Sequence, residues 1–257
     1  MSDGGWIAQL RRSLGLRLLG GHAPQPAPRR NVLFEDDAQF AAIRSEGLAR
    51  TRTPDGGAKS AEKLYNTVQI FNATAGRGGE AAECGVYRGL SAYVFCRYRQ
   101  LADRQFTGRG LTLLDSFEGL SEPTKHDMVA GARSAFIDPR SRAKGAFEGT
   151  LEQVRGALEA FPDVTYCRGW IPGSFEGLAE REYAFVHIDV DLYEPTRGAI
   201  EYFYPRLQTR GALVCDDYGF LHWPGAKQAI DEYCAPRGIP VISLTTGQCV
   251  VFRGLGS

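Results

Sequence analysis

FVHIDVDLY, residues 185–193, is a mostly apolar run that ends in two aspartates, Asp189 and Asp191. A short apolar run is typical of a strand buried on both faces, as the strands of a parallel sheet are. A carboxylate at the end of such a strand is costly to bury unless a partner compensates its charge. The stretch therefore predicts a buried strand whose end carries a functional site.

Similar runs occur on both sides of it, at 80–87, 111–117, 164–170 and 211–218. Helix-like segments separate these runs, and strands that alternate with helices indicate a parallel sheet covered on both faces. The last stretch, VISLTTGQCVVFR, reads instead as two strands joined by a short turn. We therefore predict a doubly wound, mostly parallel α/β sheet of seven strands that ends in an antiparallel hairpin.

The N-terminus lies outside this pattern. Residues 6–19 place apolar side chains on one helical stripe and arginines elsewhere, and residues 22–30 are rich in proline. We expect an amphipathic arm and linker over 1–31 and a single folded domain over 32–257. The arm is expected to pack on the protein or on a second subunit of a homo-oligomer. Its basic and apolar faces also suit a peripheral contact with an anionic membrane.

The overall composition narrows the class of partner. Thirty basic and thirty acidic side chains cancel, which argues against nucleic acid as the main partner because phosphate binding needs a basic surplus. The six cysteines show no CxxC pairing and no zinc-like spacing, so we expect reduced thiols and a cytoplasmic location. No run approaches the roughly 20 apolar residues of a membrane span.

A glycine turn, ECGVYRG, follows the first predicted strand. Gly85 and Gly89 allow the backbone to turn tightly and to approach a ligand. A dinucleotide site would have G-x-G-x-x-G, with amides aimed at a pyrophosphate. Here Glu83 stands before the turn, where it would repel pyrophosphate and suit the cationic end of S-adenosylmethionine. Asp115, at the end of the second strand, is placed to bind ribose hydroxyls. NAD sites share an acidic residue at this position, so Asp115 alone does not distinguish the two cofactors. The alternative is a turn that only packs helix on strand.

Four carboxylates fall at the ends of the fourth and fifth predicted strands: Asp189, Asp191, Asp216 and Asp217. If these strands are neighbours, the carboxylates converge at the edge of the sheet where ligands bind. Like charges so close would take up protons unless a cation compensates them, and oxygen ligands favour a hard ion such as magnesium, calcium or manganese. Two interpretations need no metal. Asp216 and Asp217 could cap the helix that follows them, or Asp189 could pair with Arg88 or Arg168.

Several stretches together resemble the macrocin and mycinamicin O-methyltransferase family: ECGVYRGLSA, LLDSFEGL, RGWIPGSFEGL, HIDVDLYEPT, and GALVCDDYG followed by PGAKQAIDEY. They occur in the family's order over roughly residues 59–235. The resemblance implies a class I methyltransferase fold, which also ends in an antiparallel hairpin. It implies S-adenosylmethionine and Mg²⁺ as cofactors and a sugar hydroxyl of a glycoside as the acceptor. The glycoside could be an antibiotic, a glycolipid or a polysaccharide.

The resemblance also implies roles for individual residues. Asp189, Asp216 and Asp217 would hold the metal, and Asp191 would accept the hydroxyl proton, with His222 as the alternative base. The implied cofactor-binding residues are Glu83, Gly85, Val86, Tyr87, Gly89, Asp115, Ser116, Gly169, Trp170 and Asp189. Residues 118–150 are expected to form a lid over the acceptor, although 121–147 follow no family pattern.

Three other functions stay open at this point. A metal-dependent methyltransferase could act on a non-sugar acceptor such as a catechol-like phenol. D-x-D also occurs in metal-dependent glycosyltransferases, which would bind a nucleotide sugar in place of S-adenosylmethionine. A catalytically idle partner subunit is the third, and the intact set of carboxylates argues against it.

Overall fold

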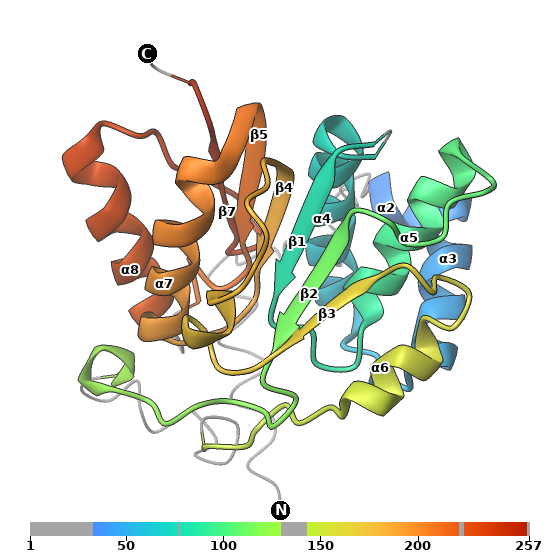
Figure 1. Cartoon of the computed structure of the whole chain (residues 1–257), viewed down its shortest axis with the longest axis horizontal. Coiled ribbons are helices and arrows are strands. Elements are labelled where there is room, and N and C mark those ends of the chain that lie inside the picture. The colour runs from blue at the N-terminus through green and yellow to red at the C-terminus, as the bar shows by residue number, and fades with distance from the viewer. Residues whose placement is uncertain (1–32, 77, 130–142, 221–223, 256–257) are drawn as a thin grey trace, which may run out of the picture. The chain divides into compact units, whose positions relative to one another are not determined.

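The folded unit of the chain comprises residues 34–257. The structure, a computed structural model, describes residues 33–76, 78–129, 143–220 and 224–255 (Figure 1). The arm and linker predicted for 1–31 lie outside these residues, and so does the subunit or membrane contact predicted for 6–19. His222 and the middle of the predicted lid, residues 130–142, also lie outside them.

A seven-stranded sheet forms the centre of this unit, in the order β3-β2-β1-β4-β5-β7-β6. Its strands are β1 (Glu80–Cys84), β2 (Leu111–Asp115), β3 (Thr165–Arg168), β4 (Tyr183–Ile188), β5 (Leu207–Cys215), β6 (Ile242–Ser243) and β7 (Cys249–Phe252). The first five are parallel, and β7 pairs antiparallel with both β5 and β6. The predicted fold class, with its closing hairpin, is therefore confirmed.

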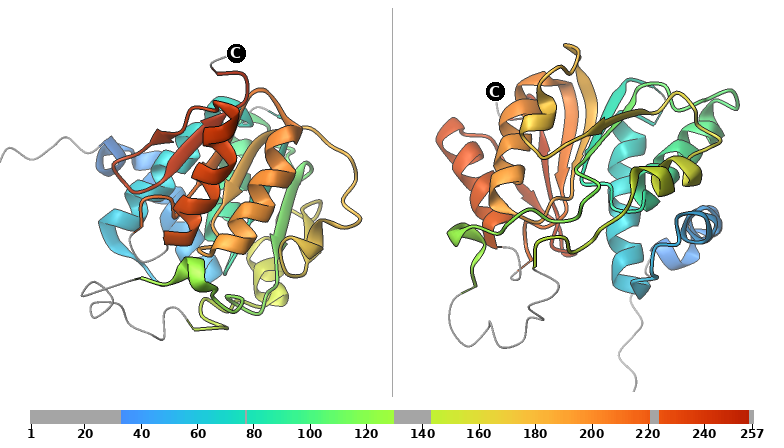
Figure 2. Two further views of the ribbon diagram at one scale, coloured as in Figure 1. Left: turned by 90° about the vertical axis from the view of Figure 1, so that its left-hand side faces the viewer. Right: turned by 60° about the horizontal axis from the view of Figure 1, so that its bottom comes forward.

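Helices cover both faces of the sheet (Figures 1 and 2). They are α2 (Leu33–Asp36), α3 (Ala38–Thr51), α4 (Gly57–Thr74), α5 (Leu90–Ala102), α6 (Leu151–Ala157), α7 (Tyr193–Phe203) and α8 (Pro224–Cys234). Helices α4 and α5 lie on one face, with α3 packed against α5, and α7 and α8 lie together on the other face. The chain runs from β1 outward to β2 and β3, and then returns to β4 on the other side of β1. Ligands of open α/β sheets bind at this reversal, outside the carboxyl ends of the strands.

Two apolar cores, one on each face, fix the central strand β4. All six of its residues are buried, as the apolar run predicts. On one face Phe185 meets Phe71 and Phe95 at ring-centroid distances of 5.3 and 5.5 Å. On the other face Tyr183 meets Phe203 at 5.0 Å. Aromatic pairs of this kind contribute about 0.5–1.5 kcal/mol beyond their buried area, so the strand that carries the aspartates is held rigidly.

The six cysteines are all free thiols, as their spacing predicts, and five of them are buried. Among the helices that the structure describes, none combines the length and apolar character needed to cross a membrane.

Candidate active site

A cavity of about 500 Å³ lies at the carboxyl ends of the parallel strands. Ten of the residues predicted for the site line it: Gly85, Tyr87, Asp115, Ser116, Gly169, Trp170, Asp189, Asp191, Asp216 and Asp217. Helix α4 and its N-cap line another side of the cavity, with Gly56, Lys59, Ser60 and Lys63. The sequence pattern and the cavity therefore point to the same end of the sheet.

The glycine turn after β1 is shaped by the end of β4 and by Asp115. Gly85 has φ 84°, and a Cβ atom there would lie 1.8 Å from the carbonyl oxygen of Asp189, so only glycine fits. One carboxylate oxygen of Asp115 accepts hydrogen bonds from the amides of Val86 and Tyr87 at 2.6 and 3.1 Å. Because Asp115 occupies these two amides, the turn does not offer them to a pyrophosphate.

Three residues of the predicted cofactor set are not among those that line the cavity: Glu83, Val86 and Gly89. The side chain of Val86 is buried, and its amide donates a hydrogen bond to Asp115. Gly89 packs against Val154, which would lie 3.2 Å from a Cβ atom at that position. Glu83 is fully buried in the sheet, and its Oε1 lies 2.9 Å from Nδ1 of His187.

Aromatic side chains stand around the cavity. Tyr87 and Phe147 meet edge to face, with ring centroids 6.0 Å apart. Trp170 keeps 38% of its surface exposed while it lines the cavity. Exposed aromatic faces of this kind suit planar or sugar rings. The described ends of the predicted lid also contribute lining residues, namely Gly119, Leu120, Ser121 and Phe147.

The carboxylates converge because β4 and β5 are neighbours in the sheet. The ladder continues past the strands, where the amide of Asp216 donates to the carbonyl of Ile188 at 2.9 Å. One carboxylate oxygen from each of Asp189, Asp216 and Asp217 lies within 4.8 Å of the others. Ligand oxygens around a single magnesium ion lie about 3 to 4 Å apart. This trio therefore fits one hard divalent cation after small side-chain adjustments.

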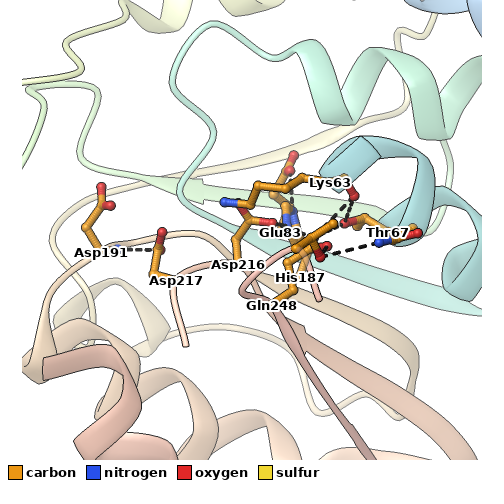
Figure 3. A network of polar contacts seen from close by, with 10 residues as sticks. Lys63, Thr67, Glu83, His187, Asp191, Asp216, Asp217 and Gln248 are labelled. Carbon is orange, nitrogen blue, oxygen red and sulfur yellow. Dashed lines mark hydrogen bonds and ion pairs between the residues drawn. The ribbon is translucent and has the colours of Figure 1, made fainter. Parts of the chain in front are cut away.

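Lys63 and His187 stand beside Asp216 (Figure 3). Although burial lowers the pKa of His187, the neighbouring Asp216 and Glu83 raise it to about 10. Lys63, on α4, forms an ion pair with one of its carboxylate oxygens. Nε2 of His187 lies 3.7 Å from the other oxygen, and Gln248 donates to that oxygen at 2.7 Å. Although burial raises the pKa of Asp216, the neighbouring His187 and Lys63 bring it below its ordinary value. These neighbours therefore favour the ionised form of Asp216, which is the form that binds a cation.

The other carboxylates are less well compensated. Burial, together with the charges of Asp216 and Asp217, raises the pKa of Asp189 well above its ordinary value. Burial and the neighbouring Asp191 and Asp216 do the same for Asp217. Burial and the charge of Asp189 raise the pKa of Asp191 to about 8. Crowded like charges thus favour proton uptake, as the sequence predicts.

Asp191 occupies a tight turn between β4 and α7. Its φ is 59°, and the amide of Leu192 donates to the carbonyl of Val190 at 2.5 Å across it. Its own amide donates to Asp217 at 3.1 Å. Asp191 lines the cavity beside the trio of metal candidates without belonging to it. It is therefore a candidate to contact a ligand in the cavity.

Neither interpretation without a metal matches the structure. Arg88 donates to the carbonyl of Arg52, and Arg168 pairs with Glu118 at 3.3 Å, so Asp189 has neither arginine as a partner. Asp216 pairs with Lys63, and the carboxylate of Asp217 accepts from the amide of Asp191, so both side chains of the second pair have partners other than a helix end.

Sequence reasoning missed Lys63, Gln248 and Asp127. Lys63 and Thr67 lie one turn apart on the face of α4 that meets the end of β5, and Gln248 donates to Thr67 at 2.8 Å. A lysine and a threonine four residues apart, on one face of a predicted helix, were the available indication. Asp127 is fully buried, although it falls in a polar stretch without family pattern.

The family model described as Macrocin-O-methyltransferase (TylF) matches residues 47–253. The chain belongs to the macrocin O-methyltransferase family. This confirms the resemblance seen in the sequence and makes the protein an O-methyltransferase. It also removes the glycosyltransferase interpretation.

Two members of known activity are similar in sequence. The 8-demethyl-8-(2,3-dimethoxy-alpha-L-rhamnosyl)-tetracenomycin-C 4'-O-methyltransferase of Streptomyces olivaceus is 32% identical over 190 residues, 71% of this chain and 68% of that protein. The demethyldecarbamoylnovobiocin O-methyltransferase of Streptomyces niveus is 27% identical over 238 residues, 89% of this chain and 86% of that protein.

Solved structures of O-methyltransferases share the fold. NovP superposes with a TM-score of 0.59 at 21% identity, covering 87% of this chain and 99% of that one. The calicheamicin methyltransferase CalS11 gives 0.62 at 16% identity, covering 85% and 94%. An O-methyltransferase from Bacillus cereus in complex with SAH gives 0.50 at 13% identity, covering 84% and 91%.

Proposed function

We propose that this family member transfers the methyl group of S-adenosylmethionine to a hydroxyl of a sugar in a glycoside, with a divalent cation held by Asp189, Asp216 and Asp217. The observation that carries the proposal is the convergence of these carboxylates, within 4.8 Å of one another, on the cavity that the glycine turn also lines. Their oxygen ligands and their excess negative charge fit Mg²⁺.

The cofactor is proposed to lie along the ends of β1, β2 and β3. Ser116 and Gly169 line this part of the cavity beside Asp115. Oδ2 of Asp115 accepts from the glycine turn and Oδ1 from the amide of Phe117 at 2.6 Å, and each carboxylate oxygen can accept further bonds from ribose hydroxyls. Trp170 offers an exposed ring for the adenine. Glu83 is buried beneath the cavity and does not line it, so it would act on the cationic end of the cofactor only at a distance, through its charge.

The acceptor is proposed to be a sugar because the name of one relative of known activity specifies a sugar group. The tetracenomycin enzyme is named for a rhamnosyl group that it methylates at the 4' oxygen. The sugar would enter over Asp191, between α4 and the described ends of the predicted lid. A phenolic acceptor remains the alternative.

Asp191 is proposed to accept the proton of the attacking hydroxyl, since it lines the cavity beside the metal trio. When bound, the divalent cation supplies Lewis-acid stabilisation of the alkoxide and orients it. The oxygen then attacks the methyl carbon in line, the C–S bond breaks, and its electron pair returns to sulfur to give S-adenosylhomocysteine. The sulfonium activates its own methyl, so alignment of the two substrates by the cavity supplies much of the remaining acceleration.

Calorimetric titration tests the two ligands separately. We expect S-adenosylmethionine to bind in Mg²⁺ and in EDTA, and Mg²⁺ to bind in a separate titration that Asp216→Asn abolishes. Asp103→Asn is the matched control, because Asp103 is exposed at the far end of α5. Failure of S-adenosylmethionine to bind in either buffer would contradict the proposal. Transfer of a radiolabelled methyl group to an α-L-rhamnoside, compared with a catechol, then decides between the acceptor classes.

The expected homo-oligomer, the subunit or membrane contact of residues 6–19 and the cytoplasmic location stay predictions. Light scattering of the full chain and of a chain without residues 1–31 tests whether the protein is a homo-oligomer and whether the arm contributes to it. Flotation of both chains with anionic and with neutral vesicles tests the membrane contact.

A further inference from the structure

Asp127 is an unusual residue outside the carboxylate cluster, because its carboxylate is completely buried and fully hydrogen-bonded. Oδ1 accepts from the amide of Tyr193 at 2.7 Å. Oδ2 accepts from the amide and the hydroxyl of Thr124 at 2.7 and 2.9 Å. One carboxylate therefore joins the short 3₁₀ turn Lys125–Asp127 to the first residue of α7.

Asp127 acts as the cap that α7 lacks in its own sequence. The N-cap position of α7 is Leu192, whose side chain cannot accept a hydrogen bond. The first amides of a helix need acceptors, and a negative charge at this end is favourable. A residue 66 positions earlier in the chain supplies both.

The environment of Asp127 is built closely around it. A Cβ atom on Gly225 of α8 would lie 2.1 Å from Oδ1 of Asp127, so glycine is needed there. His126 stacks on Tyr193 with ring centroids 4.1 Å apart and contacts Gln228 of α8 at 3.1 Å. The segment is thus docked on the N-terminal ends of both α7 and α8.

Asp191 lies two residues before the amide that Asp127 binds. A residue with positive φ in a tight turn stores strain and keeps its conformation only where neighbours fix it. Asp217 fixes the amide of Asp191 from one side. Asp127 fixes Tyr193 from the other, so the turn is held at both ends.

The same segment leads to the wall of the cavity. Gly119, Leu120 and Ser121 line the cavity just before Thr124. Leu120 and Leu192, the neighbour of Asp191, are buried in one small apolar cluster. Hydrogen bonds at Asp127 and apolar contact at Leu120 therefore connect the same two loops.

We propose that Asp127 is a positioning residue: it couples residues 119–124, of which the first three line the cavity, to the turn that carries Asp191. This inference rests on the proposed function only for the role of Asp191 as the base. The coupling itself is a property of the protein without acceptor.

Hydrogen exchange of the full chain, followed by mass spectrometry, tests the coupling. In Asp127→Ala we expect faster exchange in two separate peptides, one covering 119–124 and one covering 190–194. Asp127→Asn retains an acceptor oxygen for Tyr193 but replaces the one for Thr124 with a donor. It should therefore loosen 119–124 more than 190–194. Asp37→Ala is the control, because Asp37 caps α3 through the amide of Phe40 at 2.8 Å, away from the cavity. It should change neither peptide.

Turnover with an α-L-rhamnoside adds the functional readout. Asp127→Ala should lower kcat by about 10- to 100-fold through a misplaced Asp191, with the KM for S-adenosylmethionine unchanged and with partial rescue in Asp127→Asn. Faster exchange confined to 124–127, or equal loss in the Asp37→Ala control, would overturn the coupling. Absent S-adenosylmethionine binding would overturn the proposed function instead, and the exchange result would still be readable.

Discussion

Lys63 and Asp216 form an ion pair between α4, which precedes the sheet in sequence, and the end of β5. The lysine side chain is only 15% exposed. Asp216, Asp217 and Asp189 outweigh the burial of Lys63 and raise its pKa. A fixed cation thus stands in the carboxylate cluster, and it compensates part of the charge that a divalent ion would compensate.

Lys63→Met should destabilise the protein most when no divalent ion is present. Removal of one partner leaves the carboxylates uncompensated in a partly buried site, which should cost about 2 kcal/mol in EDTA. Mg²⁺ should then restore more stability to the variant than to the unaltered protein. Thermal unfolding in EDTA and in Mg²⁺ measures this. Lys59→Met is the control, because Lys59 lies one turn earlier on the same helix and is exposed. Equal losses in both variants would contradict the prediction.

Mg²⁺ should raise the unfolding temperature of the unaltered protein. A ligand that binds only the folded state stabilises it by about 2.7 kcal/mol at a concentration of 100 times Kd. Asp217→Asn should lose this shift because it removes one charged ligand of the trio. It should also be no less stable in EDTA, since it relieves repulsion with Asp191 and Asp216. Calorimetry of unfolding checks both points, and a Mg²⁺ shift that survives in Asp217→Asn would exclude this residue as a ligand.

Gly85→Ala should be far more damaging than its backbone conformation alone explains. Gly85 and Gly177 have similar φ values, 84° and 89°. Nothing lies within 4 Å of a Cβ atom at Gly177, whereas one at Gly85 meets the backbone of Asp189. Gly177→Ala should therefore cost about 1–2 kcal/mol. Gly85→Ala should cost several times more and abolish S-adenosylmethionine binding. Urea unfolding and calorimetric titration distinguish the two, and similar costs would show that β4 moves aside easily.

Asp191→Asn should reduce kcat by about 10²- to 10⁴-fold, the range for loss of a general base. The amide keeps the size of the side chain, so S-adenosylmethionine and Mg²⁺ should bind as before. Steady-state kinetics with an α-L-rhamnoside, together with the two titrations, measures this. Near-normal turnover would move the role of base to another group, with His222 the first to replace.

The sequence alone carried most of the fold. Strands β1 and β2 begin at the first residues of their predicted runs, Glu80 and Leu111, and all six residues of β4 are buried, because strands that are covered on both faces are largely apolar. Strand β1 ends at Cys84, before the end of the predicted run 80–87, because Gly85 has a positive φ and leaves the strand conformation. The start of β5 at Leu207 was missed, because polar and partly exposed residues follow it.

The ends of the strands, and so the identity of the acidic cluster, were also readable in the sequence. Chain order indicates which residues terminate a strand, and a parallel sheet brings those ends to one edge. Tertiary structure alone decided what surrounds them. Glu83 turns to His187 because successive strand residues face opposite sides. Lys63 on α4 pairs with Asp216 at the end of β5, and Asp127 binds the first amide of α7. Contacts between residues far apart in the chain depend on how elements pack, and periodicity along one element does not record that packing.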